Sequence, residues 1–150
     1  MSSFFQHIIE LFGKPEFSLI EAHQASTHLP IGLLLGACLL DIGGKIFRKP
    51  ALNSAGFWAQ MLGTFSLFVT MGLGYFGNPF AGKANELGQK ADLHSYFAYA
   101  ALAAFGVLAA WRALRKERMS KAESVLYGAL TACGIVIIVA AGWMGAHIAD

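Results

Sequence analysis

Four long apolar runs, separated by short polar connections, dominate the pattern along the chain. They extend over Leu29–Ile46, Ala55–Phe76, Leu93–Trp111 and Val125–Ile148. Each approaches or exceeds the roughly 20 residues that an α-helix needs to cross a bilayer. Strands of a membrane barrel would be about half as long and would alternate polar with apolar residues, which these runs do not. The pattern predicts an all-α fold, an integral membrane four-helix bundle of up-down topology.

The segment before the first run has a different character. Residues 1–13 are apolar but are interrupted by Gln6, His7 and Glu10. This spacing suits a short helix that lies in the membrane interface, although a disordered tail with some apolar residues is an alternative. The segment lacks the basic start and cleavage site of a signal peptide. We therefore expect an N-terminal interfacial segment over 1–22 and a transmembrane domain over 23–150.

Composition supports a membrane protein and excludes a soluble one. The chain has 150 residues, of which 56% are hydrophobic and 13% charged, and its mean hydropathy is +0.54. A soluble domain would carry about 25% charged residues. The net charge of +2 and the lack of a basic run among aromatics argue against nucleic acid as a partner. Cys38 and Cys133 lie within apolar runs, which predicts small buried hydrophobes and no disulfide.

The basic residues predict the orientation in the membrane. The first and third connections hold eight of the 11 Lys and Arg residues: Lys45, Arg48, Lys49, Arg112, Arg115, Lys116, Arg118 and Lys121. Because cytoplasmic loops carry an excess of Lys and Arg, these connections should be cytoplasmic. The protein should therefore be a multi-pass protein of the bacterial inner membrane, with both termini in the periplasm.

Histidines gather at the predicted outer ends of the runs. His28 opens the first run, His94 opens the third, His147 closes the fourth, and His23 lies just above the first. Antiparallel packing would bring these ends to one membrane face, and the first and third helices would lie diagonally opposite each other. Two imidazoles from a diagonal can share one iron, as in a bis-histidine haem. We expect haem b, with His28 and His94 as the first choice of axial ligands and His147 and His23 as further candidates.

Other readings of the same residues stay open. The histidines could be amphipathic interfacial residues, or all four could bind one copper, zinc or non-haem iron ion. No short metal-binding spacing occurs, and Met71 or Met144 could replace a histidine as an axial ligand. Asp41 reads as an interfacial anchor near Lys45. Glycines at the outer ends of the second and fourth runs would let a macrocycle approach the backbone, namely Gly72, Gly74, Gly77, Gly142 and Gly145.

The segment from His28 to Leu35 reads His-Leu-Pro-Ile-Gly-Leu-Leu-Leu, with Asp41 beyond it. It resembles the opening motif of a bacterial four-helix membrane family known as domain of unknown function 2231. The resemblance covers the chain from about residue 23 onward. It implies the fold and the positional roles of His23, His28, His94 and His147, although no proline follows His23 here. Some members of the family resemble small b-type cytochromes or partners of redox complexes.

The functional expectation follows from the histidines and the resemblance together. We expect a membrane-bound protein similar to a b-type cytochrome, which passes electrons from a quinol to a partner complex near the periplasmic face. The alternative is a non-catalytic accessory subunit of a larger membrane complex, with or without a histidine-bound metal ion. Either reading favours a subunit or carrier over a stand-alone enzyme. Expected partners are bilayer lipids, quinol, other redox subunits and a second copy of the chain. No internal repeat stands out in the residue pattern.

Overall fold

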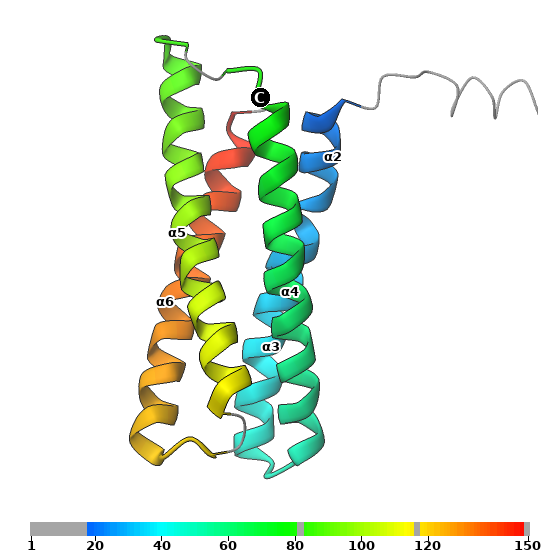
Figure 1. Cartoon of the computed structure of the whole chain (residues 1–150), viewed down its shortest axis with the longest axis vertical. Coiled ribbons are helices and arrows are strands. Elements are labelled where there is room, and N and C mark those ends of the chain that lie inside the picture. Colours follow the sequence, from blue (N-terminus) through cyan, green and yellow to red (C-terminus); the bar gives the residue numbers. More distant parts are fainter. Residues whose placement is uncertain (1–17, 81–82, 116–117, 149–150) are drawn as a thin grey trace, which may run out of the picture.

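The computed structural model describes residues 18–80, 83–115 and 118–148, and in these ranges it is built from helices alone. The helices are α2 (Leu19–Ser26), α3 (His28–Ile46), α4 (Pro50–Gly77), α5 (Glu86–Arg115) and α6 (Lys121–Ala146) (Figure 1). Since α2 and α3 follow each other with only Thr27 between them, they act as one long span.

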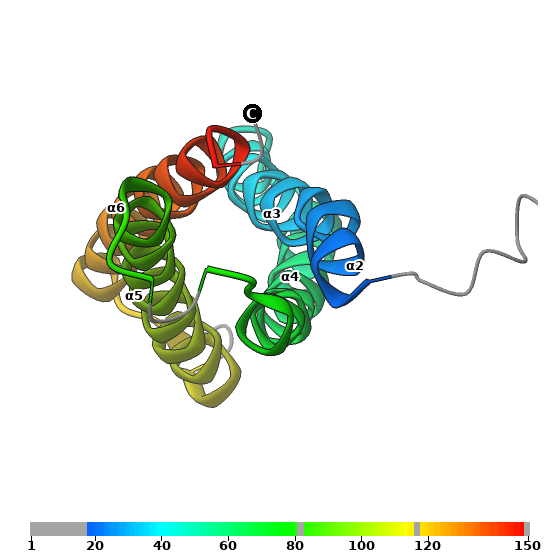
Figure 2. The same cartoon turned by 90° about the horizontal axis from the view of Figure 1, so that it is seen from above.

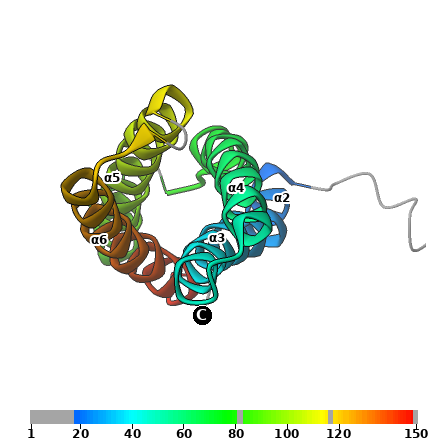
Figure 3. The same ribbon diagram turned by 90° about the horizontal axis from the view of Figure 1, so that it is seen from below.

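The helices run up and down in a ring (Figures 2 and 3). The closest backbone contacts join α3 to α4 and α5 to α6, so the bundle consists of two helix hairpins. Contacts of α4 with α5 and of α3 with α6 close the ring. Within the described ranges α3 and α5, and likewise α4 and α6, make no close backbone contact, which places each pair on a diagonal. The predicted four-helix bundle is confirmed.

Local sequence explains where the helices begin. Ser18 and Ser120 each cap a helix, and in both cases a glutamate three residues later returns a bond to the backbone N–H of the serine. Pro50 occupies the first turn of α4, where its missing N–H costs nothing. At α5 the N–H of Gly88 donates to the side-chain oxygen of Asn85, so this helix begins at Glu86 rather than at Leu93. The same effect makes α2 begin at Leu19; residues 1–17 of the predicted interfacial segment lie outside the described residues.

The core is narrow and the apolar surface is large. The largest fully buried side chains are Phe105, Leu34, Leu108 and Pro30. In contrast, Leu39 is 69% exposed and Leu114 is 83% exposed. All four spans are long and apolar enough to cross a membrane. Contact of these side chains with lipid hydrocarbon is favourable, whereas their exposure to water would cost free energy. Cys133 belongs to this exposed surface and not to the interior as predicted, while Cys38 is half-buried.

Gly63 permits the close approach of α4 to α3. A Cβ atom at this position would lie 2.9 Å from Cγ of Leu34, whereas a Cβ atom on Gly106 would meet nothing within 4 Å. Because overpacking a tight core costs about 1–3 kcal/mol, we expect Gly63→Ala to lower the free energy of unfolding by that amount. Gly106→Ala should leave it unchanged or raised. Thermal unfolding of the two variants in detergent checks this; equal stability would contradict it.

Candidate functional site

Two imidazole rings meet inside the bundle, near the end where α2 begins, which we call the histidine end. His23 comes from α2 and His94 from the third turn of α5, across the diagonal of the ring. Their ring centroids are 6.1 Å apart and their planes form an angle of 77°. Both side chains are half-buried. The structure therefore brings one histidine from each hairpin into direct proximity.

Backbone carbonyls place a hydrogen on Nδ1 of both rings. Nδ1 of His23 lies 2.8 Å from the carbonyl oxygen of Thr70, and Nδ1 of His94 lies 2.9 Å from that of Ala141. A carbonyl can only accept a hydrogen bond, so each Nδ1 carries the hydrogen. In the neutral ring the lone pair then belongs to Nε2, which is the usual arrangement of a metal-binding histidine. In each neutral ring Nε2 is therefore the nitrogen with a lone pair available for a ligand.

The two hairpins repeat each other, which the residue pattern did not reveal. Both histidines bind a carbonyl 47 residues further along the chain. The two hairpins align without insertions or deletions, so that each residue of the first corresponds to the residue of the second that lies as far along the chain as His94 lies from His23. Corresponding residues have matching structural roles. The equivalent pairs include Leu34 and Phe105, Asp41 and Arg112, Gly63 and Gly134, Thr70 and Ala141, and Gly74 and Gly145. The histidine pair therefore lies on an approximate two-fold axis along the bundle.

Two glycines make room for the rings. A Cβ atom on Gly74 would lie 2.8 Å from Cε1 of His23, and one on Gly145 would lie 3.0 Å from Cε1 of His94. Of the other glycines that were expected to face a macrocycle, Gly77 packs against the backbone at the start of α2, and Gly72 has nothing within 4 Å of its Cβ position. Gly74 and Gly145 thus serve the imidazoles themselves.

This contact gives a test of the site. Alanine at Gly74 should push the ring of His23 from its carbonyl partner, because the added methyl group and Cε1 cannot both keep their places. Loss of an orienting partner typically weakens metal binding by about 10–100-fold, and we expect Gly74→Ala to fall in this range. Gly72→Ala, on the same helix, should bind like the unmodified protein. Metal titration of both variants measures the difference; equal affinities would show that the ring position is not needed.

The remaining histidine candidates lie apart from this pair. His28 is exposed at the start of α3. His147 is exposed as well; its Nδ1 lies 2.8 Å from the carbonyl oxygen of Trp143, and its ring packs on that indole at 4.3 Å between centroids. Over residues 18–80, 83–115 and 118–148, no three His, Cys, Asp or Glu side chains gather as a metal site. The structure thus joins His23, not His28, to His94.

A small cavity adjoins the histidine pair. Its volume is about 40 Å³, and its walls include Met71, Leu67 and Ile138 besides the two rings. The centroid separation of 6.1 Å is compatible with one ion bound to both rings through metal–nitrogen bonds of about 2 Å. The cavity suits a single ion, whereas larger ligands occupy pockets of about 300–1,000 Å³. A haem between the rings would require α4 and α6 to move apart.

A charged network lies nearer the opposite end of the bundle. Arg112 donates to both carboxylate oxygens of Asp41, at 2.6 and 2.5 Å, and to Oε1 of Gln60 at 2.9 Å. The hydroxyl of Tyr127 donates to the same Gln60 oxygen. The side chains of Arg112 and Asp41 are only 11% and 19% exposed. Asp41 is therefore one half of an ion pair between the hairpins, rather than the predicted interfacial anchor beside Lys45.

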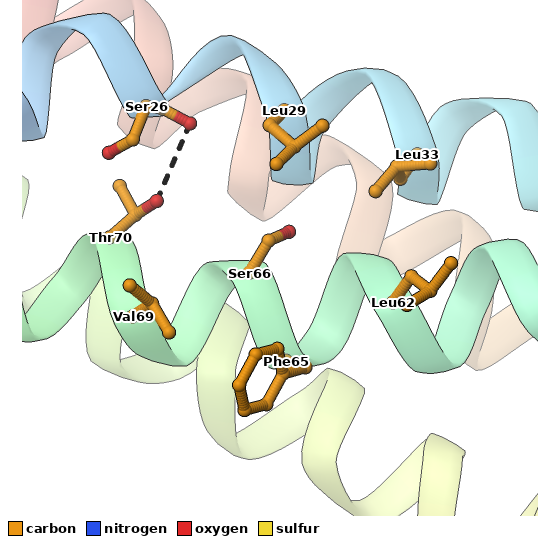
Figure 4. A pocket seen from close by; sticks show the side chains of 8 residues that line it. All are labelled: Ser26, Leu29, Leu33, Leu62, Phe65, Ser66, Val69 and Thr70. Atoms are coloured by element: carbon orange, nitrogen blue, oxygen red, sulfur yellow. Dashed lines mark hydrogen bonds between the residues drawn. The ribbon is translucent and has the colours of Figure 1, made fainter.

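An apolar groove lies on the outer surface between α3 and α4 (Figure 4). It has a volume of about 440 Å³ and is lined by Leu29, Leu33, Leu62 and Phe65, with Ser26 and Thr70 at its histidine end. The hydroxyl of Thr70 donates to the carbonyl of Ser26, so no polar atom is directed into the groove. The groove thus reaches the residue whose carbonyl holds His23.

Comparison with known proteins agrees with this architecture. Residues 20–150 match the family described as predicted membrane protein (DUF2231). No curated protein and no solved structure matches the chain. The match covers all four spans, both histidines of the pair and the ion pair between the hairpins. With its four apolar helices and this match over nearly its whole length, the chain belongs to the DUF2231 family of predicted membrane proteins.

Proposed function

We propose that the protein is a one-electron carrier of the membrane, with a metal centre held by His23 and His94. The observation that carries the proposal is the pair of rings from opposite hairpins, each with Nδ1 bound to a carbonyl and Nε2 free to ligate. Imidazole nitrogen binds copper and iron, and either metal can change its charge by one unit. Haem b, the occupant expected from the sequence, would require α4 and α6 to separate, whereas the cavity as it stands admits a single metal ion.

The proposed electron donor is a quinol dissolved in the bilayer. The apolar groove between α3 and α4 supports this, because it can hold a hydrocarbon tail and ends at Ser26 and Thr70, beside His23. A quinol gives up two electrons and two protons. A metal held by His23 and His94 would supply one-electron chemistry: it would take the electrons of the quinol one at a time, with one proton released from the quinol per electron, and a redox partner at the histidine end would receive each electron.

The proposed orientation places the histidine end in the periplasm of a bacterium and the connections after α3 and α5 in the cytoplasm. The excess of Lys and Arg in those connections supports it. Single cysteines introduced into a variant that lacks Cys38 and Cys133 test it with a membrane-impermeant thiol reagent on intact cells. Cysteine at Asn78 should react, and cysteine at Arg48 should react only after lysis. The reverse pattern would overturn the orientation.

The carrier function is tested on the full chain purified in mild detergent. We expect about one transition-metal centre per chain, a reversible one-electron redox titration, and reduction by a soluble quinol analogue that is faster than the spontaneous reaction. Iron with the absorbance bands of a b-type cytochrome would identify haem. Protein that remains free of metal and haem, even when prepared from cells supplied with both, would contradict the proposal and favour an accessory subunit without a cofactor.

A further inference from the structure

The cavity beside the histidine pair offers a third donor. Met71 follows Thr70 on α4 and lines the cavity together with His23 and His94. Its thioether is a soft ligand, and imidazole nitrogen also suits copper. The equivalent position in the second hairpin is Gly142, which has no side chain to fill the same space. The two-fold repeat is thus broken at this point, where only the first hairpin brings a thioether side chain to the cavity wall.

The lack of anionic side chains in the cavity wall bears on which ion could bind there. Among the residues that line it, all in the described part of the chain, none carries a carboxylate or a thiolate. Three neutral donors leave the full charge of the metal uncompensated in an apolar interior. The cost of burying an ion rises steeply with its charge, so a monovalent cation is favoured over a divalent one. Zinc is disfavoured further, because its structural sites use four ligands.

The size of the cavity agrees with this choice. The cavity volume of about 40 Å³ exceeds the roughly 10–15 Å³ that one water molecule needs, so a single ion fits. The separation of 6.1 Å between the ring centroids is compatible with two metal–nitrogen bonds of about 2 Å. We propose that His23, His94 and Met71 bind one Cu(I) ion. This rests on the histidine-held centre proposed above and names its metal.

The test titrates the full-length protein with Cu(I), without oxygen, against a coloured Cu(I) chelator in detergent. We expect one Cu(I) per chain, with two nitrogen atoms and one sulfur atom around it in X-ray absorption. Met71→Leu keeps the volume of the side chain and removes the sulfur. It should lower the Cu(I) affinity by about tenfold or more, and the sulfur signal should vanish. Met144→Leu, at the same end of the bundle but not in the cavity wall, should change neither quantity.

Each result has a distinct meaning. Binding that Met71→Leu weakens and Met144→Leu does not would support the site. Equal affinities for the two variants, with both proteins eluting as folded monodisperse species, would overturn the three-donor site. Haem or zinc in place of Cu(I), lost on replacement of His23 or His94, would overturn the copper assignment while the histidine-held centre stands. Protein that takes up none of these would overturn both proposals.

Discussion

Replacing His23 by alanine is expected to abolish metal binding, and replacing His94 should do the same. Each ring supplies one of the two Nε2 ligands, and the structure offers no other imidazole near the pair in its described part. The loss should exceed the 10–100-fold that follows from removal of an outer partner, because a direct ligand is removed. Metal content per chain and the redox titration measure the effect in detergent-purified protein.

Two further histidines supply the matched controls. His28 is exposed on α3, and His147 packs on Trp143 at the surface, so alanine at either position should leave metal content unchanged. The comparison also decides between two ligand pairs, since the sequence alone favoured His28 and His94. If His28→Ala loses the metal and His23→Ala retains it, the pair seen here is not the binding site.

The largest loss of stability is expected from Arg112→Leu. The guanidinium satisfies both oxygens of Asp41 and also bonds Gln60 and the carbonyl of Asn53, at 3.0 Å. Removing one member of a buried ion pair leaves the other charge unpaired and typically costs about 3–5 kcal/mol. Because hydrocarbon surrounds this bundle, the unpaired carboxylate has little access to water. We expect a decrease of this size in the free energy of unfolding, measured by thermal or denaturant unfolding in detergent.

Two control variants show how the loss of stability in Arg112→Leu arises. Arg115→Ala removes an ion pair with Glu123 whose side chains are 49% and 28% exposed, and such pairs contribute only about 0–1 kcal/mol. The double variant Asp41→Leu/Arg112→Leu removes both charges and should recover most of the stability. A double variant as unstable as Arg112→Leu alone would show that the arginine acts through its bonds to α4 and not through the carboxylate.

The fold could be predicted from the sequence because bilayer thickness imposes a long, nearly continuous apolar pattern on each span. The helix ends could not, because capping by Ser18 and Ser120 extends helices into polar segments. This error affected the site. With the first span assumed to begin at Leu29, His23 lay outside the bundle and His28 lay at its entrance. With a helix that begins at Leu19, His23 comes to face the interior instead.

His23 and His94 nevertheless share one feature of the sequence that the other two candidates lack. Glu21 precedes His23 by two residues, and Asp92 precedes His94 in the same way. No comparable residue precedes His28 or His147. Few residues are identical between the hairpins. The repeat becomes visible only from the structure, in which both histidines contact a carbonyl 47 residues further along and each ring packs against a glycine. The ion pair of Asp41 and Arg112 was hidden for the same reason, since equivalent positions carry opposite charges.

That opposition has a consequence for assembly. Because the two hairpins are alike, a hairpin from one molecule could in principle take the place of its counterpart in another. Two first hairpins together would set carboxylate against carboxylate, and two second hairpins would set guanidinium against guanidinium. Only a first and a second hairpin neutralise each other, and the short loop keeps these two within reach in one chain. The charge difference thus disfavours the pairing of two identical hairpins, whereas an exchange of second hairpins between molecules would keep the pair of Asp41 and Arg112.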